Sequence, residues 1–269
     1  MDKYEKLEEI LDGIGDAVIA YSGGVDSTLL LKAAYDRSRE NGAKILAITA
    51  RSSTYPESEF NAAIDIARTI GAPYRVIESG ELQIEGFATN PPDRCFYCKG
   101  ELFGILGKIA EEDGYSVVCD GSNADDNSDY RPGRKAATER GVRSPLMEAG
   151  MTKDDIRFHA KRLSLPNWDK PAAACLASRF PYGTSITDEK LKRIEKAEET
   201  LKREGFGQVR VRYHEGIARI EVSPVRITEL ASHPGLKDLV REIKSFGFDF
   251  VVLDLEGYRT GSFNELLKR

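Results

Sequence analysis

The sequence predicts an α/β fold, in which a doubly wound and mainly parallel sheet is followed by a smaller α+β domain. Two observations lead to this prediction. In the first two thirds of the chain, short apolar runs alternate with segments of helical periodicity, which is typical of parallel strands joined by crossover helices. The last third combines charged helical segments with strands of alternating pattern. We expect residues 1–179 to form the larger domain and residues 180–269 the smaller one.

The strands of the larger domain are expected at four apolar runs, residues 16–20, 44–50, 74–78 and 115–119. The segments around them carry the spacing of amphipathic helices, which we place at residues 26–37, 56–70, 99–112 and 153–163. Pro56 suits the first turn of its helix, because its missing N–H group needs no intrahelical partner there. The polar segment 120–133 is expected to form a loop at the end of the fourth strand.

The smaller domain is expected to begin with a charged helix at residues 188–204, which ends at Gly205. Two strands with alternating side chains follow at residues 208–214 and 217–222. Helical sequence then continues to about residue 246, and a last strand is expected at residues 248–253. This mixture of helices and strands predicts a small α+β domain.

Composition narrows the functional classes. Of the 269 residues, 41% are apolar, which is enough for a substantial core. The 39 basic and 44 acidic residues give a net charge of −5, and this argues against a general nucleic-acid binder because such proteins usually carry a basic excess. No apolar run reaches the roughly 18 residues of a membrane helix. The charged N-terminus lacks the apolar core of a secretory signal, so we expect a cytoplasmic protein.

The most informative motif joins the first expected strand to the following helix and reads Ser22-Gly23-Gly24-Val25-Asp26-Ser27. Its glycines permit a tight turn, and backbone N–H groups at a helix N-terminus can face phosphates. The two serines add hydroxyl donors, and Asp26 supplies a carboxylate of the kind that holds Mg²⁺. An ordinary strand-to-helix turn is the alternative interpretation. The motif is neither a Walker A loop nor a dinucleotide-binding Gly-x-Gly-x-x-Gly.

Two further segments are expected at the same edge of the sheet, because open parallel sheets bind ligands beyond the carboxyl ends of their strands. Thr49 and Ser52 follow the second strand, and Asn123 follows the fourth. These residues are candidate walls of a nucleotide site. For each of them alone, a polar strand end or a solvated loop explains the sequence equally well.

Three of the four cysteines form a candidate metal or sulfur site. Cys95 and Cys98 make a Cys-x-x-Cys pair, which we expect between a proline-containing loop and a helix, and Cys175 follows much later. Zinc, a redox disulfide and an iron–sulfur cluster all suit the pair alone. Three thiolates without a fourth suit a [4Fe–4S] cluster with one open iron, and unconnected reduced thiols are the alternative. Cys119 ends an apolar strand and is expected to be a buried structural thiol.

These motifs resemble the PP-loop superfamily of ATP pyrophosphatases and, within it, the LarE family of ATP-dependent sulfur transferases. The resemblance covers nearly the whole chain and implies a fold like that of the adenine nucleotide alpha hydrolases. Besides the phosphate-loop motif, it rests on residues 120–126, 131–133, 144–146, 168–171, 175–179, 210–212 and 218–222. The phosphate loop alone is specific only for the superfamily, whereas the segment around Cys175 is much more specific for the family.

The resemblance implies a two-stage reaction on a small-molecule nucleotide, pyridinium-3,5-dicarboxylate mononucleotide. ATP, with Mg²⁺, adenylylates one carboxylate and releases pyrophosphate, and sulfur then displaces AMP to give a thiocarboxylate. The resemblance also implies that sulfide or another donor supplies the sulfur and that the protein is a homo-oligomer. Neither a membrane nor a nucleic acid is an expected partner.

The resemblance also implies roles for individual residues. Nucleotide binding is expected at the whole motif Ser22–Ser27 and at Thr49, Ser52 and Asn123. The expected catalytic residues are Asp26, Cys175, Ser178 and Arg179. Some family members sacrifice the cysteine at the position of Cys175, whereas the added Cys-x-x-Cys implies a [4Fe–4S] cluster ligated by Cys95, Cys98 and Cys175. By pattern alone a solvated strand face is as good an interpretation, but the resemblance implies that the substrate phosphate is bound by Arg210 and Arg212.

Three rival functions use the same phosphate loop. A tRNA thiolation enzyme of this superfamily also combines it with three cysteines, but usually needs a basic RNA surface that the net charge of −5 does not suggest. An ammonia-dependent amide-forming ligase would make the cysteines incidental. A nucleotide-binding regulator without catalysis would release no pyrophosphate.

Overall fold

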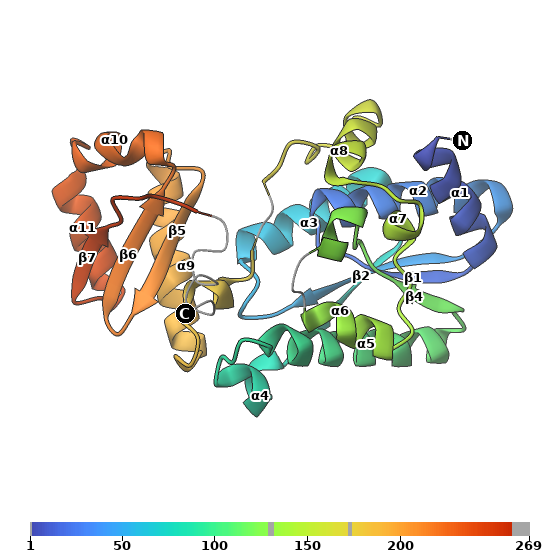
Figure 1. Cartoon of the computed structure of the whole chain (residues 1–269), viewed down its shortest axis with the longest axis horizontal. Coiled ribbons are helices and arrows are strands. Elements are labelled where there is room, and N and C mark those ends of the chain that lie inside the picture. Colours follow the sequence, from blue (N-terminus) through green and yellow to red (C-terminus); the bar gives the residue numbers. More distant parts are fainter. Residues whose placement is uncertain (1, 129–131, 172–173, 260–269) are drawn as a thin grey trace. The chain divides into compact units, whose positions relative to one another are not determined.

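The computed structural model describes residues 2–128, 132–171 and 174–259, which fold into two compact units (Figure 1). The first unit takes Met1–Glu81 and Asp93–Ala173, and the second takes Leu82–Pro92 and Ala174–Arg269. The chain therefore passes between the units three times, whereas the border expected after residue 179 has a single passage. Arg131, which is part of the family resemblance, lies outside the described residues.

The first unit is built on a sheet of four parallel strands in the order β3-β2-β1-β4. Its strands are β1 (Ala17–Ala20), β2 (Ile45–Arg51), β3 (Tyr74–Glu78) and β4 (Val117–Cys119). Its helices are α1 (Lys3–Ile14), α2 (Val25–Asn41), α3 (Glu57–Ile70), α5 (Arg94–Asp113), α6 (Pro132–Glu139), α7 (Pro145–Glu148) and α8 (Lys153–Arg162). Every strand that the sequence predicted for the larger domain is present, and all are parallel.

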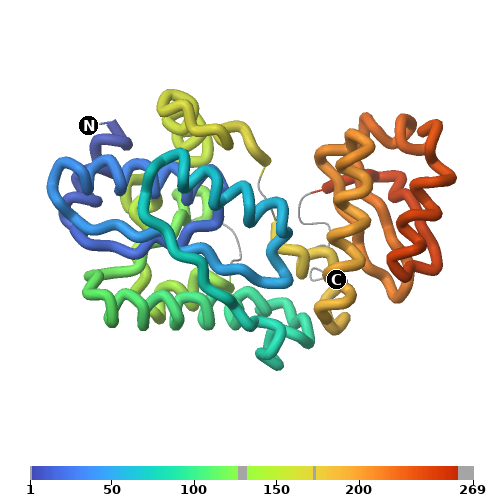
Figure 2. The backbone as a smooth tube through the Cα atoms, turned by 180° about the vertical axis from the view of Figure 1, so that it is seen from behind, coloured from blue at the N-terminus to red at the C-terminus, as the bar shows by residue number. Residues whose placement is uncertain are grey.

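Helices cover both faces of this sheet, as Figures 1 and 2 show. Because strand residues alternate between faces, Ile19 of β1 packs in one apolar core and its neighbour Val18 in another. The first core includes Leu29 of α2, and the second includes Leu106 of α5. This burial on both sides confirms the doubly wound α/β prediction. No helix in the described part of the chain is both long and apolar enough to cross a bilayer.

The strand order creates a switch point beside β1. From β1 the chain runs outward through β2 to β3, and it then returns to place β4 on the other side of β1. Ligands of open α/β sheets bind at such a point, beyond the carboxyl ends of the strands. The loop after β1 is the phosphate-loop motif, and the loop after β4 begins at Asp120. The fold therefore places two of the predicted binding segments where the topology favours a ligand.

The second unit is a three-stranded sheet in the order β5-β6-β7, with helices packed against it. Strands β5 (Val209–His214) and β6 (Ile217–Val222) are antiparallel, and β7 (Phe250–Leu253) runs parallel to β6. Its helices are α4 (Glu85–Ala88), α9 (Asp188–Arg203), α10 (Ile227–Ala231) and α11 (Leu236–Ser245), with a 3₁₀ turn at Leu176–Arg179. This arrangement confirms the predicted small α+β region near the C-terminus.

One local prediction was wrong. The Cys-x-x-Cys pair was expected before a helix starting near residue 99, but α5 already begins at Arg94 and contains both cysteines. Pro91 and Pro92 lie in the preceding loop, just before the N-cap residue Asp93. The side chain of Arg94 is buried, which anchors the first helical turn. Cys95 and Cys98 therefore stand three residues apart along a helix, on neighbouring positions of its surface.

Candidate functional site

The phosphate-loop motif turns from β1 into α2 and is held by its own serines. The Ser27 hydroxyl donates to the carbonyl oxygen of Gly24 (3.1 Å) and accepts the backbone N–H of Ser22 (3.3 Å). The two serine hydroxyl oxygens lie 3.2 Å apart. Because the first N–H groups of a helix have no intrahelical acceptor, the start of α2 presents donors beside these hydroxyls. The motif therefore has the geometry of an anion-binding turn, and the buried Val25 fixes it to the core.

Close packing explains two glycines at this turn. Gly23 has a φ of 65°, and a Cβ added there would lie 2.5 Å from the Cβ of Ala63 in α3. A Cβ added to Gly121, in the loop after β4, would lie 2.9 Å from the backbone nitrogen of Ser27. Both distances are too short for nonbonded atoms, so neither position has room for a Cβ. Helix α3 and the loop after β4 thus pack directly against the backbone of the phosphate loop.

The carboxylate of Asp26 is bracketed by two side chains from distant parts of the first unit. The Asn123 amide donates to Asp26 Oδ1 (3.2 Å), and the Lys153 ammonium lies 2.5 Å from Oδ2. The side chains of Asp26 and Lys153 keep 22% and 27% of their exposure. Asp26 and Asn123, both predicted from the sequence, are thus brought together at the switch point. The carboxylate stays open to solvent on one side.

Sequence reasoning missed Lys153, because its partner lies 127 residues earlier and no motif links them. One local signal was available. Lys153 opens α8, where the helix dipole favours acidic residues, and Asp154 and Asp155 follow this preference. The preference of helix N-termini for acidic residues therefore does not explain a lysine at this position.

Two other residues that the sequence analysis did not select hold backbone carbonyls of the motif. The Tyr55 hydroxyl donates to the carbonyl oxygen of Ser22 (2.5 Å), and burial raises the pKa of this phenol, so it remains a donor. The Asn167 amide donates to the carbonyl oxygen of Gly23 (2.8 Å) and to the Thr28 hydroxyl (2.9 Å). These bonds occupy the carbonyls on one side of the turn and leave the N–H groups of α2 for a ligand.

The end of β2 contributes one unsatisfied hydroxyl and one that is already engaged. Thr49 is 1% exposed, and its Oγ1 has no hydrogen-bond partner among the described residues. The Ser52 hydroxyl lies 3.1 Å from that of Thr54, which donates to the buried carboxylate of Glu81 (2.5 Å). A buried hydroxyl without a partner is unfavourable, so Thr49 is the better candidate of the two for a ligand contact.

A cavity of about 620 Å³ opens elsewhere on the first unit, between α3 and the segment Pro166–Pro171. Its lining contains none of the residues that the sequence selected for a site. Asn167 joins this lining to the phosphate loop through its bond to the carbonyl oxygen of Gly23. Convergent polar groups lie at the phosphate loop, so that loop is the candidate site of this unit.

In the second unit, a buried ion pair joins Arg179 to Glu198 of α9. The guanidinium donates through Nε and Nη2 to the two carboxylate oxygens, at 2.8 and 2.9 Å. Glu198 also accepts the backbone N–H of Val211 in β5 (3.0 Å). Burial alone would raise the pKa of Glu198, but the charge and hydrogen bonds of Arg179 outweigh it and hold this pKa below its ordinary value. The pair is therefore charged at neutral pH.

A second buried pair lies on the β5–β6 ladder. Arg212 Nε and Nη2 both donate to Glu221 Oε2 (2.9 and 2.8 Å), and Arg219 Nη2 donates to Oε1 (2.9 Å). The antiparallel register places Arg212 opposite Arg219, so both cations reach the same carboxylate. The solvated strand face that the pattern allowed is thus not found at Arg212, which is buried.

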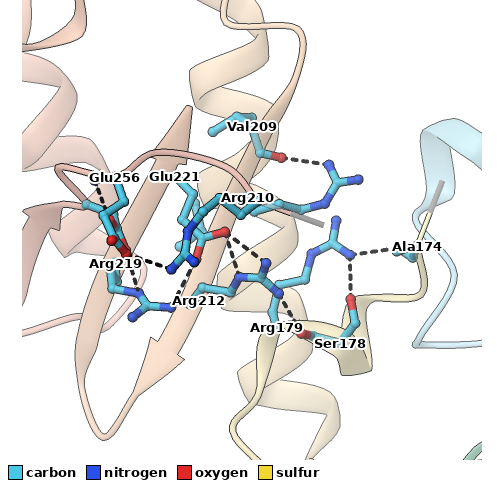
Figure 3. Close-up of polar contacts among 12 residues, drawn as sticks. Ala174, Ser178, Arg179, Val209, Arg210, Arg212, Arg219, Glu221 and Glu256 are labelled. Atoms are coloured by element: carbon cyan, nitrogen blue, oxygen red, sulfur yellow. Dashed lines mark hydrogen bonds and ion pairs between the residues drawn. The ribbon is translucent and has the colours of Figure 1, made fainter. Parts of the chain in front are cut away.

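Both buried arginines also hold the turn that carries Cys175 (Figure 3). Arg179 Nη1 donates to the carbonyl oxygens of Ala174 (2.7 Å) and Cys175 (3.1 Å) and lies 3.0 Å from the Ser178 hydroxyl. Arg212 Nη1 donates to the carbonyl oxygen of Ser178 (2.8 Å). All three nitrogens of Arg179 have acceptors in the protein, so the geometry gives Arg179 a supporting role for the exposed Cys175.

Arg210 differs from Arg179 and Arg212 in its ionic contacts. It is half-buried, donates through Nη1 to its neighbour's backbone at Val209 (2.8 Å), and lies over the Tyr258 ring at 5.2 Å. It forms no salt bridge with any residue that the structure describes. Burial is the main cause that lowers the pKa of Arg210, and the nearby charge of Arg179 lowers this pKa further. Figure 3 shows the Arg210 guanidinium beside those of Arg179 and Arg212. A half-buried cation among other cations is suited to an anionic ligand.

The cysteines divide between the units. Cys95 is exposed and Cys98 half-buried on α5 of the first unit, whereas the exposed Cys175 belongs to the second. No three metal-binding side chains gather within the described residues. Cys119 is buried, which confirms the sequence prediction, and burial raises the pKa of its thiol to about 12. The three-cysteine ligand set stays a prediction.

Comparison with known proteins places these features in context. No protein-family model matches the chain. The pyridinium-3,5-bisthiocarboxylic acid mononucleotide synthase of Lactiplantibacillus plantarum is 39% identical over 269 residues, which cover 99% of this chain and 95% of that protein. An uncharacterised protein of Synechocystis is 45% identical over 267 residues, covering 99% and 98%. An uncharacterised protein of Methanocaldococcus jannaschii is 34% identical over 243 residues, covering 90% of each chain. The similarity extends through both units.

Proposed function

Because the chain belongs to the LarE family of pyridinium-3,5-bisthiocarboxylic acid mononucleotide synthases, we propose that it converts a carboxylate of pyridinium-3,5-dicarboxylate mononucleotide into a thiocarboxylate with consumption of ATP. The name of the relative from Lactiplantibacillus plantarum supports the thiocarboxylate product. The observation that carries the ATP-dependent part is the phosphate-loop turn at the switch point, with Asp26 in the first turn of α2.

The reaction needs activation because a carboxylate oxygen is a poor leaving group. In the first step, a carboxylate oxygen attacks the α-phosphorus of ATP, the bond from that phosphorus to the bridging oxygen breaks, and pyrophosphate leaves with the electron pair. In the second step, hydrosulfide attacks the acyl carbon and AMP leaves with the electron pair of the carbon–oxygen bond. The second step thus gives the thiocarboxylate, AMP and a proton, and pyrophosphate has left in the first. No atom is oxidised or reduced in either step. Sulfur anions are strong nucleophiles and suit this displacement.

Residues of the first unit suit the adenylylation step. The N–H groups at the start of α2 and the hydroxyls of Ser22 and Ser27 would hold the phosphates. Thr49, with its unsatisfied hydroxyl, would contact the nucleoside at the end of β2. Asp26 fits Mg²⁺, because its carboxylate is a hard oxygen donor, partly exposed and oriented by Asn123. When bound, Mg²⁺ would neutralise phosphate charge there.

Residues of the second unit suit the substrate nucleotide. Arg210, which forms no salt bridge with a described residue, would bind the substrate phosphate, and the O–H group of Ser178 would be a further donor. Arg212 is held by Glu221 and would add its charge rather than a new ion pair. Glu198 and Glu221 keep the arginines in place, which prepares the anion site before the substrate arrives.

We also propose that Cys95, Cys98 and Cys175 ligate a [4Fe–4S] cluster. Thiolates are the soft donors that such clusters require, and two of them lie three residues apart on α5. When bound, the cluster would supply an open iron that carries sulfide taken from a sulfur donor. The alternative within the family is that Cys175 gives up its own sulfur.

Pyrophosphate release tests the proposed function. Purified protein is given Mg·ATP and pyridinium-3,5-dicarboxylate mononucleotide, and the release of pyrophosphate and the mass of the substrate are followed. We expect release to depend on the substrate and to fall by at least about a hundredfold in Asp26→Asn, since charge stabilisation of this kind contributes strongly to catalysis. Asp36→Asn, on the same helix and paired with Lys32, is the matched control and should retain release. Release that requires ammonia or tRNA instead of this substrate would contradict the proposal.

Iron and acid-labile sulfide content tests the cluster separately. Protein purified without oxygen should contain about four irons per chain, and Cys95→Ala, Cys98→Ala and Cys175→Ala should each lose them. Cys119→Ala is the matched control, because that thiol is buried in the core. Absence of iron combined with a loss of sulfur mass at Cys175 after turnover would replace the cluster with the sacrificial route.

A further inference from the structure

Glu81 is a buried acid that forms no ion pair with any residue that the structure describes. It is 2% exposed, and its two carboxylate oxygens accept different hydroxyls. Oε1 accepts from Thr54 (2.5 Å), and Oε2 accepts from Ser79 (2.7 Å). The carboxylate of Glu101 approaches the same Ser79 hydroxyl (3.2 Å), which adds a like charge nearby. Neutral donors compensate a buried carboxylate less fully than a cation does, so stability does not explain why an acid stands here.

The Glu81 carboxylate determines the direction of a short chain of hydroxyls in the segment after β2. A threonine hydroxyl has one proton, and the Thr54 proton goes to Glu81. The contact between the hydroxyl oxygens of Ser52 and Thr54 (3.1 Å) must therefore use the proton of Ser52. The Ser52 oxygen also accepts the backbone N–H of Thr54 (3.3 Å). Ser52 consequently keeps one lone pair for a ligand but has no proton to donate.

The same segment contacts the phosphate loop. The Tyr55 hydroxyl donates to the carbonyl oxygen of Ser22 (2.5 Å), and Ser52 directly follows β2, the strand that pairs with β1. Ser52 therefore lies at the edge of the sheet where the phosphate loop begins. A hydroxyl that can only accept is unsuited to a phosphate oxygen, which is itself an acceptor. It suits a donor of the nucleotide, which in ATP is a ribose hydroxyl or the adenine amino group.

We propose that Glu81 is a positioning residue for nucleotide selection, which orients the Ser52 hydroxyl so that its oxygen accepts a hydrogen bond from the nucleoside of ATP. This inference rests on the proposed function, since it assumes that the site binds ATP, and it adds a contact to the one proposed at Thr49. Glu81 does not touch the ligand and acts through Thr54. An ionised carboxylate suits this role because it can only accept. Without it, the Thr54 hydroxyl turns its proton to Ser52, and the Ser52 proton becomes free.

Affinities for nucleotide analogues test the proposal. Calorimetry compares Mg·ATP with 2′-deoxy-ATP, 3′-deoxy-ATP and purine riboside triphosphate, each of which lacks one donor of the nucleoside. The unchanged protein should bind one of these analogues about tenfold more weakly than ATP, because its hydrogen bond to Ser52 is missing. In Glu81→Met this penalty should shrink to less than about twofold, since Ser52 then no longer requires a donor. Glu78→Met, at the exposed end of β3, is the matched control and should keep the penalty.

Two further variants identify the donor and cover the case in which Glu81→Met does not fold. Ser52→Ala removes the acceptor, and Thr54→Val removes the link to Glu81 while keeping the side-chain shape. The penalty of the same analogue should disappear in both variants. If no penalty disappears in Ser52→Ala, Ser52 does not contact the nucleoside and the proposal is overturned. If Thr54→Val keeps the penalty that Ser52→Ala removes, the chain to Glu81 does not orient Ser52, and the proposal is equally overturned.

Binding of Mg·ATP itself separates the inference from the proposed function. If the unchanged protein binds no Mg·ATP, the proposed function fails. If it binds Mg·ATP and Glu81→Met weakens ATP and every analogue by the same factor, Glu81 supports the fold alone. In that case the proposed function stands and the role of Glu81 in nucleotide selection is overturned.

Discussion

The ionic contacts of the two units differ in burial and in how fully each side chain is engaged. In the first unit, Asp26 and Lys153 share one contact and keep 22% and 27% of their exposure. In the second unit, Arg179 and Glu198 share two hydrogen bonds and are 3% and 2% exposed. Water and ions reach the first pair, so a ligand can replace either partner. Opening the second pair would leave a buried charge without compensation.

Under the proposed function, this difference separates residues that bind ligands from residues that support the site. A contact that exchanges suits a nucleotide site, where phosphates and a metal ion arrive and leave. A contact that cannot exchange suits a scaffold, and Arg179 uses it to hold the turn of Cys175. The charge of a residue therefore does not reveal its role, since both units contain ion pairs between acidic and basic side chains. The two kinds of pair differ in burial and in the number of hydrogen bonds.

The largest expected effect comes from breaking the buried pair of the second unit. Glu198→Gln leaves the Arg179 charge uncompensated, so we expect a loss of about 3–5 kcal/mol in the free energy of unfolding. Chemical denaturation followed by circular dichroism measures it. Glu199→Gln, at the next and exposed position of α9, is the matched control and should change stability by less than about 0.5 kcal/mol. Equal stability of the two variants would mean that the buried pair is no stronger than the surface contacts.

The pH dependence sharpens this comparison. Arg179 holds the pKa of Glu198 below its ordinary value of 4.5, so the folded protein binds fewer protons at this group than the unfolded chain. The stabilisation is therefore fully present above pH 4.5 and is lost as the pH falls through the lowered pKa. The stability gap between the unchanged protein and Glu198→Gln should accordingly narrow in acid. A gap that widens below pH 4.5 would contradict the lowered pKa.

A smaller effect on stability is expected at the phosphate loop, where it comes from backbone geometry and packing. Gly23→Ala forces a Cβ into the left-handed region, which costs about 1–2 kcal/mol, and against Ala63, which adds about 1–3 kcal/mol of overpacking. Gly24→Ala is the matched control, because φ there is −70° and its Cβ would meet only Ser22 Oγ at 3.5 Å. We expect thermal denaturation and calorimetry to show reduced stability and ATP affinity in the first variant. Similar melting temperatures for the two variants would remove the packing argument; ATP affinity is compared with the unchanged protein, because Gly24 also belongs to the phosphate loop.

Sequence reasoning predicted the parallel sheet and the closeness of Asn123 to the candidate phosphate loop, whose ligand stays a prediction. The parallel sheet followed from apolar runs that alternate with amphipathic segments. The phosphate loop lies within six consecutive residues, and Asn123 could be added because the carboxyl ends of parallel strands share one edge. Each of these predictions uses local pattern or a general rule of topology.

The contacts that the sequence did not predict join residues far apart in the chain. Asn167 reaches Gly23 across 144 positions, and Lys153 reaches Asp26 across 127. The pairing of Arg212 with Glu221 depends on strand register, which alternation alone does not determine. The start of α5 was placed too late because apolar periodicity begins after its first turn, although the buried Arg94 already anchors that turn.

The smallest expected effect concerns Thr49, where stability and binding should change in opposite directions. Its Oγ1 is buried without a partner among the described residues, so Thr49→Val removes an unsatisfied hydroxyl and should stabilise the first unit by up to about 1 kcal/mol. The same change at Thr28, whose hydroxyl accepts from Asn167, should destabilise by about 1 kcal/mol. The proposed contact between Thr49 and the nucleoside predicts that ATP affinity falls in Thr49→Val. If Thr49→Val destabilises as Thr28→Val does, Thr49 has a partner in the protein and supports the loop without binding the nucleotide.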